Sequence, residues 1–323
     1  MEMSSLNISA DHVMSHRCRI LWPRRNSVWR MGSYPIRESV LTLKSAIESV
    51  GTSVNIMRCP EEYRGNLSVS VIEHDTPWMR DVSPMFAWKT EEDLPYSGIH
   101  WTHQGSGSSK DALIPSTLLM NEHIQVISCI GYELDPNMMI TNGKGIFIIS
   151  KNLFAAKNPN LDEKGLEVLL RRVTYIDKVI WVRGDFGGID NVVNFIDENN
   201  VILNWTENKG DVLYDIFSNT ASQLEKKGIN VWRVSIPSER RRSPEEAMGT
   251  DVTGGERLML GYASFFHGRD GIVIPQYGDH YIDEYARNLF ENVLAMKKVV
   301  PVDGMEFALG GGSIRRITGC YYK

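Results

Sequence analysis

The sequence predicts an α/β fold in which five helix-and-strand units follow one another within a single domain. Four amphipathic segments and a fifth, weaker one are typical of helices, and an apolar, strand-like run follows each of them. The unit recurs at intervals of roughly 50–75 residues, which indicates an internal repeat. Five such units form either a closed ring or an open sheet, and periodicity alone does not decide between the two.

Proline and glycine mark the ends of the expected helices. Pro35 lies in the first turn of one helix, and Gly51 and Gly228 each follow the end of one. We expect helices over 35–51, from 159 through an apolar stripe at 166–170, over 211–227 and over 279–298, with a weaker one at 112–121. The strand-like runs after these helices lie at 54–57, 124–127, 179–182, 231–234 and 299–302, with further strands at 145–149, 192–196, 201–205 and 271–274.

Composition places the chain among globular proteins of enzyme size. Of its 323 residues, 42% are hydrophobic and 23% are charged, and the formal net charge is −5. No stretch approaches the roughly 18 apolar residues that a membrane span needs. The first residues lack the basic start and apolar centre of a signal peptide. We therefore expect a cytoplasmic protein that binds neither nucleic acid nor membrane, with its oligomeric state left open between monomer, homo-oligomer and hetero-oligomer.

The four cysteines are scattered along the chain, at Cys18, Cys59, Cys129 and Cys320. Their spacing favours buried, reduced thiols over a disulfide framework or a structural zinc site, so we expect no metal and no cofactor. A basic run at 239–246 is bracketed by glutamates. It is typical of a solvated loop, with a regulatory or partner contact as the alternative.

Three stretches place charged residues in apolar surroundings rich in turns. In the first, at 75–84, Trp78 and Asp81 flank Arg80 between two prolines. A rigid loop that presents an aromatic face and a carboxylate suits a cationic ligand. An Arg–Asp ion pair that holds a turn together is the alternative.

The second and third stretches contain glycines that allow the backbone to approach another group closely. At 187–191 two glycines precede Asp190, which faces a ligand or lies in a plain hairpin turn. At 310–319, the sequence G-G-G-S-I-R-R-I-T-G brings two arginines after three glycines.

The three stretches together resemble one known family. In this order, W-M-R-D-x-x-P, G-G-I-D-N and G-G-G-S-I-x-x-I-T are similar to motifs of the agmatine deiminases and bacterial peptidylarginine deiminases. Segments 19–23, 142–145 and 274–279 extend the resemblance, which covers about residues 16–318. It implies a pentein-like fivefold pseudosymmetric α/β propeller of the amidinotransferase superfamily, with an N-terminal extension at 1–15 and the pentein domain at 16–323.

The resemblance also implies a chemistry. Family members attack the guanidinium carbon with a cysteine thiolate, a histidine moves protons, and carboxylates hold the guanidinium nitrogens. In this chain the carboxylate positions are Asp81, Asp190 and Asp135, with Glu133 as a substitute for the last. The histidine position is Gly188, the histidine before the cysteine is Arg315, and the cysteine position is Arg316.

We therefore expect a carboxylate-lined pocket without the Cys/His machinery. Asp81, Asp135, Asp190 and Arg316 are the candidates for its chemistry, because ionised carboxylates held together need a cation. Alternatively, Arg316 makes a surface ion pair. The candidate ligand-binding residues are Trp78, Arg80, Glu133, Gly188, Gly311, Gly312 and Arg315.

Three functional interpretations remain open at this point. The first is a hydrolase-like pseudoenzyme that binds a small guanidino or amino compound, or a partner protein. The second is an enzyme that uses non-covalent acid–base chemistry, such as cyclisation, elimination or hydrolysis, on an arginine-derived or zwitterionic metabolite. The third is a regulatory subunit of an active homologue.

Overall fold

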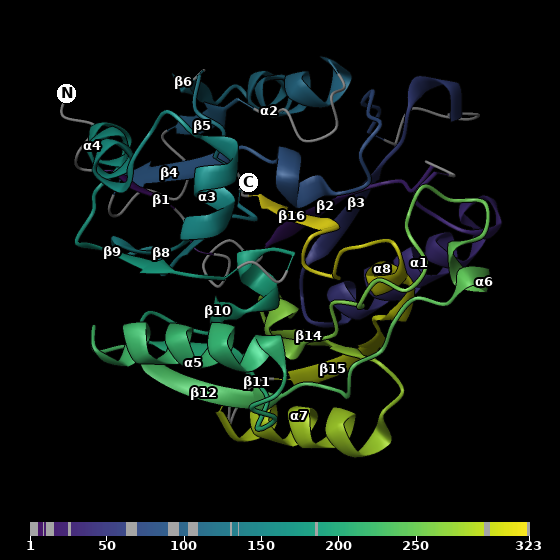
Figure 1. The fold of residues 1–323 in the computed structure, drawn as a ribbon. Helices are drawn as coiled ribbons and strands as arrows, with labels where there is room; N and C mark the ends of the chain where they lie inside the picture. The colour runs from purple at the N-terminus through teal and green to yellow at the C-terminus, as the bar shows by residue number, and fades with distance from the viewer. Residues whose placement is uncertain are drawn as a thin grey trace.

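The computed structural model describes residues 6–8, 10, 16–24, 27–62, 70–89, 97–102, 109–129, 131–134, 136–184, 187–293 and 298–321. Within these residues the chain forms five small sheets arranged around a common centre (Figure 1). The inner strands β10 and β16 lie toward the centre of the view, and helices α1, α5 and α7 lie toward the outside.

Every sheet repeats one pattern of three strands. A middle strand pairs antiparallel with an inner strand and parallel with an outer one. In the order inner, middle and outer, the sheets are β16 (Thr318–Tyr321), β2 (Arg17–Leu21) and β3 (Ser53–Met57); β4 (Met85–Lys89), β5 (Ser97–Trp101) and β6 (Gln125–Cys129); β7 (Met139–Thr141), β8 (Ile146–Ser150) and β9 (Lys178–Val182); β10 (Val193–Phe195), β11 (Asn200–Trp205) and β12 (Asn230–Ser235); β13 (Phe266–His267), β14 (Gly271–Gln276) and β15 (Lys298–Asp303). β1 (Leu6–Ile8) adds a fourth strand to the second sheet, so part of the expected N-terminal extension belongs to a sheet.

The ring closes because the last strand completes the first sheet. β16 pairs antiparallel with β2, so that Thr318 lies opposite Ile20. This pairing brings residues from the end of the chain beside those from its beginning. It decides the question that the periodicity left open, in favour of a closed ring.

Helices connect the parallel strands of each sheet, as a parallel pair requires. They are α1 (Tyr34–Ser49), α2 (Ser109–Asn121), α3 (Lys151–Lys157) with α4 (Glu163–Val173), α5 (Val212–Glu225) and α7 (His280–Val293), while two short helices, α6 (Pro244–Ala247) and α8 (Met305–Leu309), lie outside this pattern. Side-chain caps explain several starts, because Asp162 accepts a hydrogen bond from the Gly165 amide and Asp211 accepts one from the Leu213 amide.

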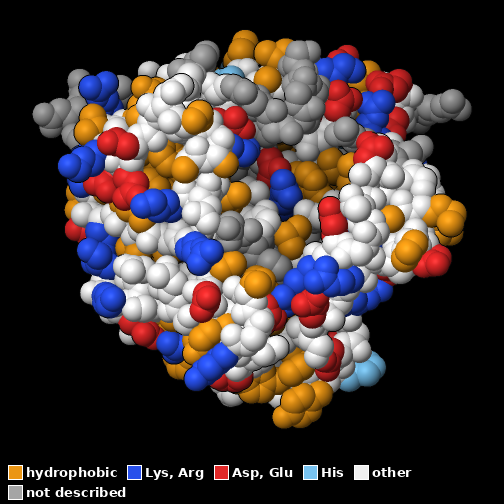
Figure 2. Space-filling model, in the orientation of Figure 1, with side chains coloured by type: hydrophobic (Ala, Val, Ile, Leu, Met, Phe, Trp, Pro, Cys, Tyr) orange, Lys and Arg blue, Asp and Glu red, His pale blue; other side chains and the backbone are white. Residues whose placement is uncertain are grey.

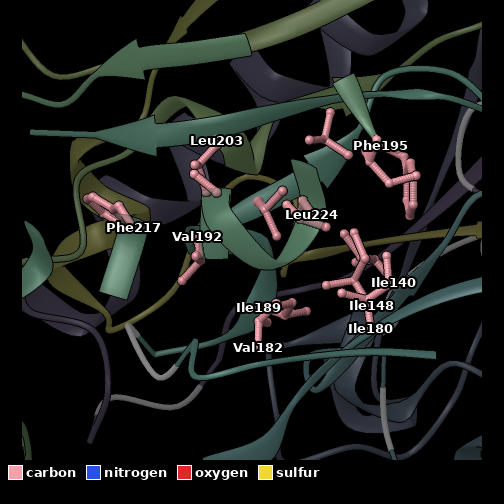
Figure 3. Close-up of a cluster of buried hydrophobic side chains, with 14 of the residues drawn as sticks. Ile140, Ile148, Ile180, Val182, Ile189, Val192, Phe195, Leu203, Phe217 and Leu224 are labelled. Atoms are coloured by element: carbon pink, nitrogen blue, oxygen red, sulfur yellow. The ribbon is translucent and has the colours of Figure 1, made fainter. Parts of the chain in front are cut away.

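Buried apolar side chains fix the turns that carry charged residues. One cluster joins the third and fourth sheets to α5 and includes Ile189 and Val192, which flank Asp190 (Figure 3). A second cluster contains Ile314 and Ile317, which flank the two arginines of the glycine-rich stretch. The core therefore sets where these polar side chains point.

The structure confirms the expected fold class and all five outer strands, and it corrects several boundaries. Lys298 begins β15, so the last long helix, described over His280–Val293, does not extend to the expected residue 298. Residues 314–317 form a turn that carries the two arginines, and β16 begins after it at Thr318. No helix among the described residues is long and apolar enough to cross a membrane.

Candidate functional site

The structure brings the three charged stretches together at one place. The amide of Arg80 donates to the Arg316 carbonyl at 3.0 Å, which joins the 3-10 turn Met79–Val82 to the glycine-rich loop. Arg315, next along the chain, lies beside Asp190 in the 3-10 turn Ile189–Asn191. Figure 2 shows a hollow near the middle of one face, where acidic and basic side chains lie among hydrophobic ones.

Each of the three positions 310–312 requires glycine for its own physical reason. A Cβ on Gly310 would lie 1.9 Å from the Trp29 ring, and one on Gly312 would lie 2.4 Å from the Trp78 ring. Gly311 instead has a φ of 81°, a conformation that side chains disfavour. The loop therefore packs against two tryptophans, which contact each other with ring centroids 5.3 Å apart.

Arg316 points inward and pairs with Asp81. Its Nε lies 3.1 Å from both carboxylate oxygens, and its Nη2 lies 2.7 Å from Oδ2. Its Nη1 donates to the Gly311 carbonyl at 3.1 Å, and its guanidinium carbon lies 5.1 Å from the centroid of the Trp78 ring. The side chains of Arg316 and Asp81 are 20% and 10% exposed. A guanidinium thus occupies a site with a carboxylate, a carbonyl and an aromatic face, which are groups suited to that cation.

A second, more deeply buried pair lies beside the first. Arg315 Nη1 is 3.7 Å from Asp190 Oδ2, and the Asp190 side chain is fully buried. Neither Asp190 oxygen accepts a hydrogen bond from the residues that the structure describes. A buried carboxylate in this setting depends on the nearby guanidinium for its charge balance.

The Asn137 side chain occupies the space beside Gly188. A Cβ on Gly188 would lie 2.1 Å from Asn137 Oδ1 and 2.8 Å from Asp190 Oδ1. The Ile189 amide donates to the Asn137 carbonyl at 2.9 Å, which fixes the two segments against each other. A side chain at 188 is therefore excluded unless Asn137 moves.

The remaining sequence candidates lie in different settings. Arg80 is buried, and its Nε donates to the Pro136 carbonyl at 3.4 Å, so it supports the wall of the site. Glu133 accepts from Lys157 Nζ at 2.7 Å, which gives its carboxylate a partner on α3. Asp135 lies outside the described residues.

Three residues of this region were missed by the sequence reasoning. Trp29 and Asn137 lie outside the recognised motifs. The position of Trp29, shortly after the Trp-Pro at the end of the first strand, could have indicated that its ring packs near the motif loops. Arg242 was placed in a solvated loop, yet its side chain is 3% exposed. Its Nε donates to the Leu309 carbonyl at 3.1 Å and its Nη1 to Glu256 at 2.7 Å, which holds the segment before the glycines. This corrects the expectation for Arg242, whereas its neighbours Arg240 and Arg241 are 40% and 60% exposed, as a solvated segment requires.

None of the four cysteines lies at the position of Arg316; Cys18, Cys59 and Cys129 are buried, and Cys320 is partly buried. Cys59 is fully buried with its sulfur 3.4 Å from His74 Nδ1. Burial raises the pKa of the Cys59 thiol and raises that of Cys129 to about 11. Protonated, enclosed thiols are poor nucleophiles.

The ring of five repeated units, with two arginine–aspartate pairs where its loops meet, defines the chain as a pentein. It is similar to the agmatine deiminase of Enterococcus faecalis, with a TM-score of 0.88, 21% identity, and coverage of 99% of this chain and 96% of that one. It is also similar to a cysteine-to-serine variant of the agmatine deiminase of C. Jejuni with substrate bound (TM-score 0.80, 19% identity, coverage 98% and 96%).

Sequence comparison gives the family. The model for Porphyromonas-type peptidyl-arginine deiminases matches residues 7–320, and the chain belongs to this family. The agmatine deiminase of Pseudomonas putida is 26% identical, with 93% of this chain and 90% of that protein covered. The resemblance inferred from the motifs is confirmed at the level of family and fold.

Proposed function

We propose that this family member binds a small guanidino or amino compound at Asp81 and does not perform cysteine-dependent deimination. The observation that carries the proposal is the pair between Arg316 and Asp81. Arg316 stands where the family resemblance expects the nucleophile, and its guanidinium lies on a carboxylate that the resemblance assigns to guanidinium binding. The chain thus supplies an internal copy of the ligand group in place of the group that would attack it.

The chemistry of the side chains supports the loss of the thiolate route. A guanidinium carries no nucleophilic lone pair at neutral pH, and its pKa keeps it protonated. Gly188, at the expected histidine position, offers no group that moves a proton. The buried Cys59 thiol does not replace the nucleophile, because its pKa is raised by burial.

The same contacts support retained binding. Asp81, the Gly311 carbonyl and the Trp78 face are arranged around a guanidinium with hydrogen bonds of 2.7–3.1 Å. Because this arrangement fits Arg316, it also fits a ligand guanidinium once the Arg316 side chain moves aside. Binding is then a competition between an internal and an external cation for one carboxylate.

Replacement of Arg316 tests the proposal. In Arg316→Ala, Asp81 loses its partner, and breaking a largely buried pair costs about 3 kcal/mol of stability. The same variant should bind agmatine about tenfold or more tightly than the parent, measured by calorimetry. Arg287→Ala, which removes an exposed arginine on α7, is the control and should change neither quantity much.

An Arg316→Ala variant that binds agmatine no better than the parent, at unchanged stability, would contradict the proposal. If this variant fails to fold, Arg316→Gln keeps most of the side-chain volume without the charge. Its agmatine affinity then decides the same question.

A further inference from the structure

We infer that the ligand of this site is a zwitterion that carries a carboxylate as well as a guanidinium or amino group, such as an α-amino acid of the arginine type. The inference rests on the proposed function and names its ligand class. It follows from what happens to Arg316 when a ligand cation takes its place at Asp81.

The exchange at Asp81 replaces one cation by another. Before it, the Arg316 guanidinium is neutralised by Asp81 through bonds from Nε and Nη2. After it, Asp81 neutralises the ligand, and the Arg316 charge needs a new partner. A dication leaves two positive charges without partners at this largely buried site, whereas a carboxylate on the ligand supplies one negative charge for Arg316.

The displaced guanidinium stays within reach of the ligand because the backbone of Arg316 is fixed. Its amide donates to Ser313 Oγ at 3.1 Å, and its carbonyl accepts from the Arg80 amide at 3.0 Å. The flanking Ile314 and Ile317 are buried. Only the side chain moves, so its five donors remain beside the site and can hold a carboxylate through two parallel hydrogen bonds.

Among the described residues, three acidic side chains around the glycine-rich loop already face a cation. Arg315 lies 3.7 Å from Asp190, and Glu306 of α8 pairs with Arg30. Glu246 of α6 pairs with Arg240 at 2.5 Å. Moving the Arg316 guanidinium onto one of them would place two guanidinium groups on a single carboxylate, so a carboxylate brought by the ligand is the better partner.

Arginine and agmatine form a matched pair for the test, since they differ only in the α-carboxylate. Calorimetry on the parent protein should give an affinity for arginine about tenfold or more above that for agmatine. In Arg316→Ala this preference should fall to within about threefold or reverse, because no freed guanidinium remains to hold the carboxylate. Arg316→Gln serves if the alanine variant does not fold, and Arg287→Ala should keep the preference of the parent.

The outcomes separate this inference from the proposed function. Three results would overturn the inference that the ligand is a zwitterion. The parent would bind the two compounds with equal affinity, bind agmatine more tightly, or bind neither. In each case, a gain of agmatine affinity in Arg316→Ala would leave the proposed function standing. A failure of that gain in Arg316→Ala, or in Arg316→Gln where the alanine variant does not fold, would overturn the proposed function as well.

Discussion

Arg316 Nη2 lies 2.7 Å from Asp81 Oδ2, across 235 residues of sequence, at the junction between the glycine-rich loop and the first charged turn. The relationship depends on both loops, because the Arg80 amide also donates to the Arg316 carbonyl. It places a guanidinium of the chain itself in a site suited to that group. The predictions below follow from this pair and from the residues around it.

The first prediction concerns catalysis. The protein should release no ammonia from agmatine or arginine at steady turnover, because loss of an essential nucleophile typically costs about 10⁴–10⁶ in rate. The agmatine deiminase of Pseudomonas putida is the positive control. Turnover that disappears when any single cysteine, above all Cys59, is changed to alanine would show that the nucleophile has moved.

The second prediction concerns the two carboxylates. Asp81→Asn and Asp190→Asn should each abolish the rise in melting temperature that arginine or agmatine produces, since each change removes a negative charge from the site. Asp211→Asn is a control: Asp211 caps α5 and pairs with Arg257 at 2.6 Å and contacts neither Asp81 nor Asp190, so this variant loses stability but should keep the ligand response. Variants at 81 and 190 that respond like the parent would place the binding site elsewhere.

The third prediction concerns the space between Gly188 and Asn137. Gly188→His alone should destabilise the protein by about 1–3 kcal/mol, because its Cβ would lie 2.1 Å from Asn137 Oδ1. Adding Asn137→Gly removes the obstructing amide. The double variant should therefore be more stable than the sum of the single effects by about 1–3 kcal/mol, measured by urea unfolding. Additive effects would mean that the two side chains do not compete for this space.

The fourth prediction concerns the thiols and pH. Burial raises the pKa of Cys129 to about 11 from an ordinary value of 9.0, so its thiolate is scarce at pH 8. Cys129 and Cys59 should react with iodoacetamide far more slowly in the native protein than after unfolding, and peptide mass mapping measures this. The protonated Cys129 thiol also contributes stability that declines as the pH rises from about 9 to about 11. Rapid alkylation of Cys59 in the native protein would contradict the claim that this thiol is buried and protonated.

The sequence predicted the repeat well because each unit carries a strong local pattern. The helices α1 and α5 have proline, aspartate or glycine at their ends, and the outer strands contain several β-branched or other apolar residues each. The inner strands β7 and β13 were missed because they contain three and two residues. Their strand geometry comes from pairing with a middle strand, which no local pattern records.

The sequence indicated the candidate-site residues that lie in motifs. It missed the residues that only tertiary contacts bring to the site. Asp81 and Arg316 come together as expected, because both lie in motif loops. Arg242 was assigned to solvent because its neighbours are charged, yet its bonds to Leu309 and Glu256 depend on long-range packing. Asn137 fills the space beside a glycine distant in sequence, which becomes visible only when both segments are placed.

The crystal structure of Arg316→Ala, grown with guanidinium chloride, tests the central claim most directly. The account predicts a guanidinium ion bound to both oxygens of Asp81, within hydrogen-bonding distance of the Gly311 carbonyl and beside the Trp78 ring. The positions of these groups should match those they hold around Arg316 in the parent. An Asp81 side chain turned to solvent or bound to another residue, with no guanidinium beside it at saturating concentration, would contradict the claim that Arg316 is an internal ligand of a guanidinium site.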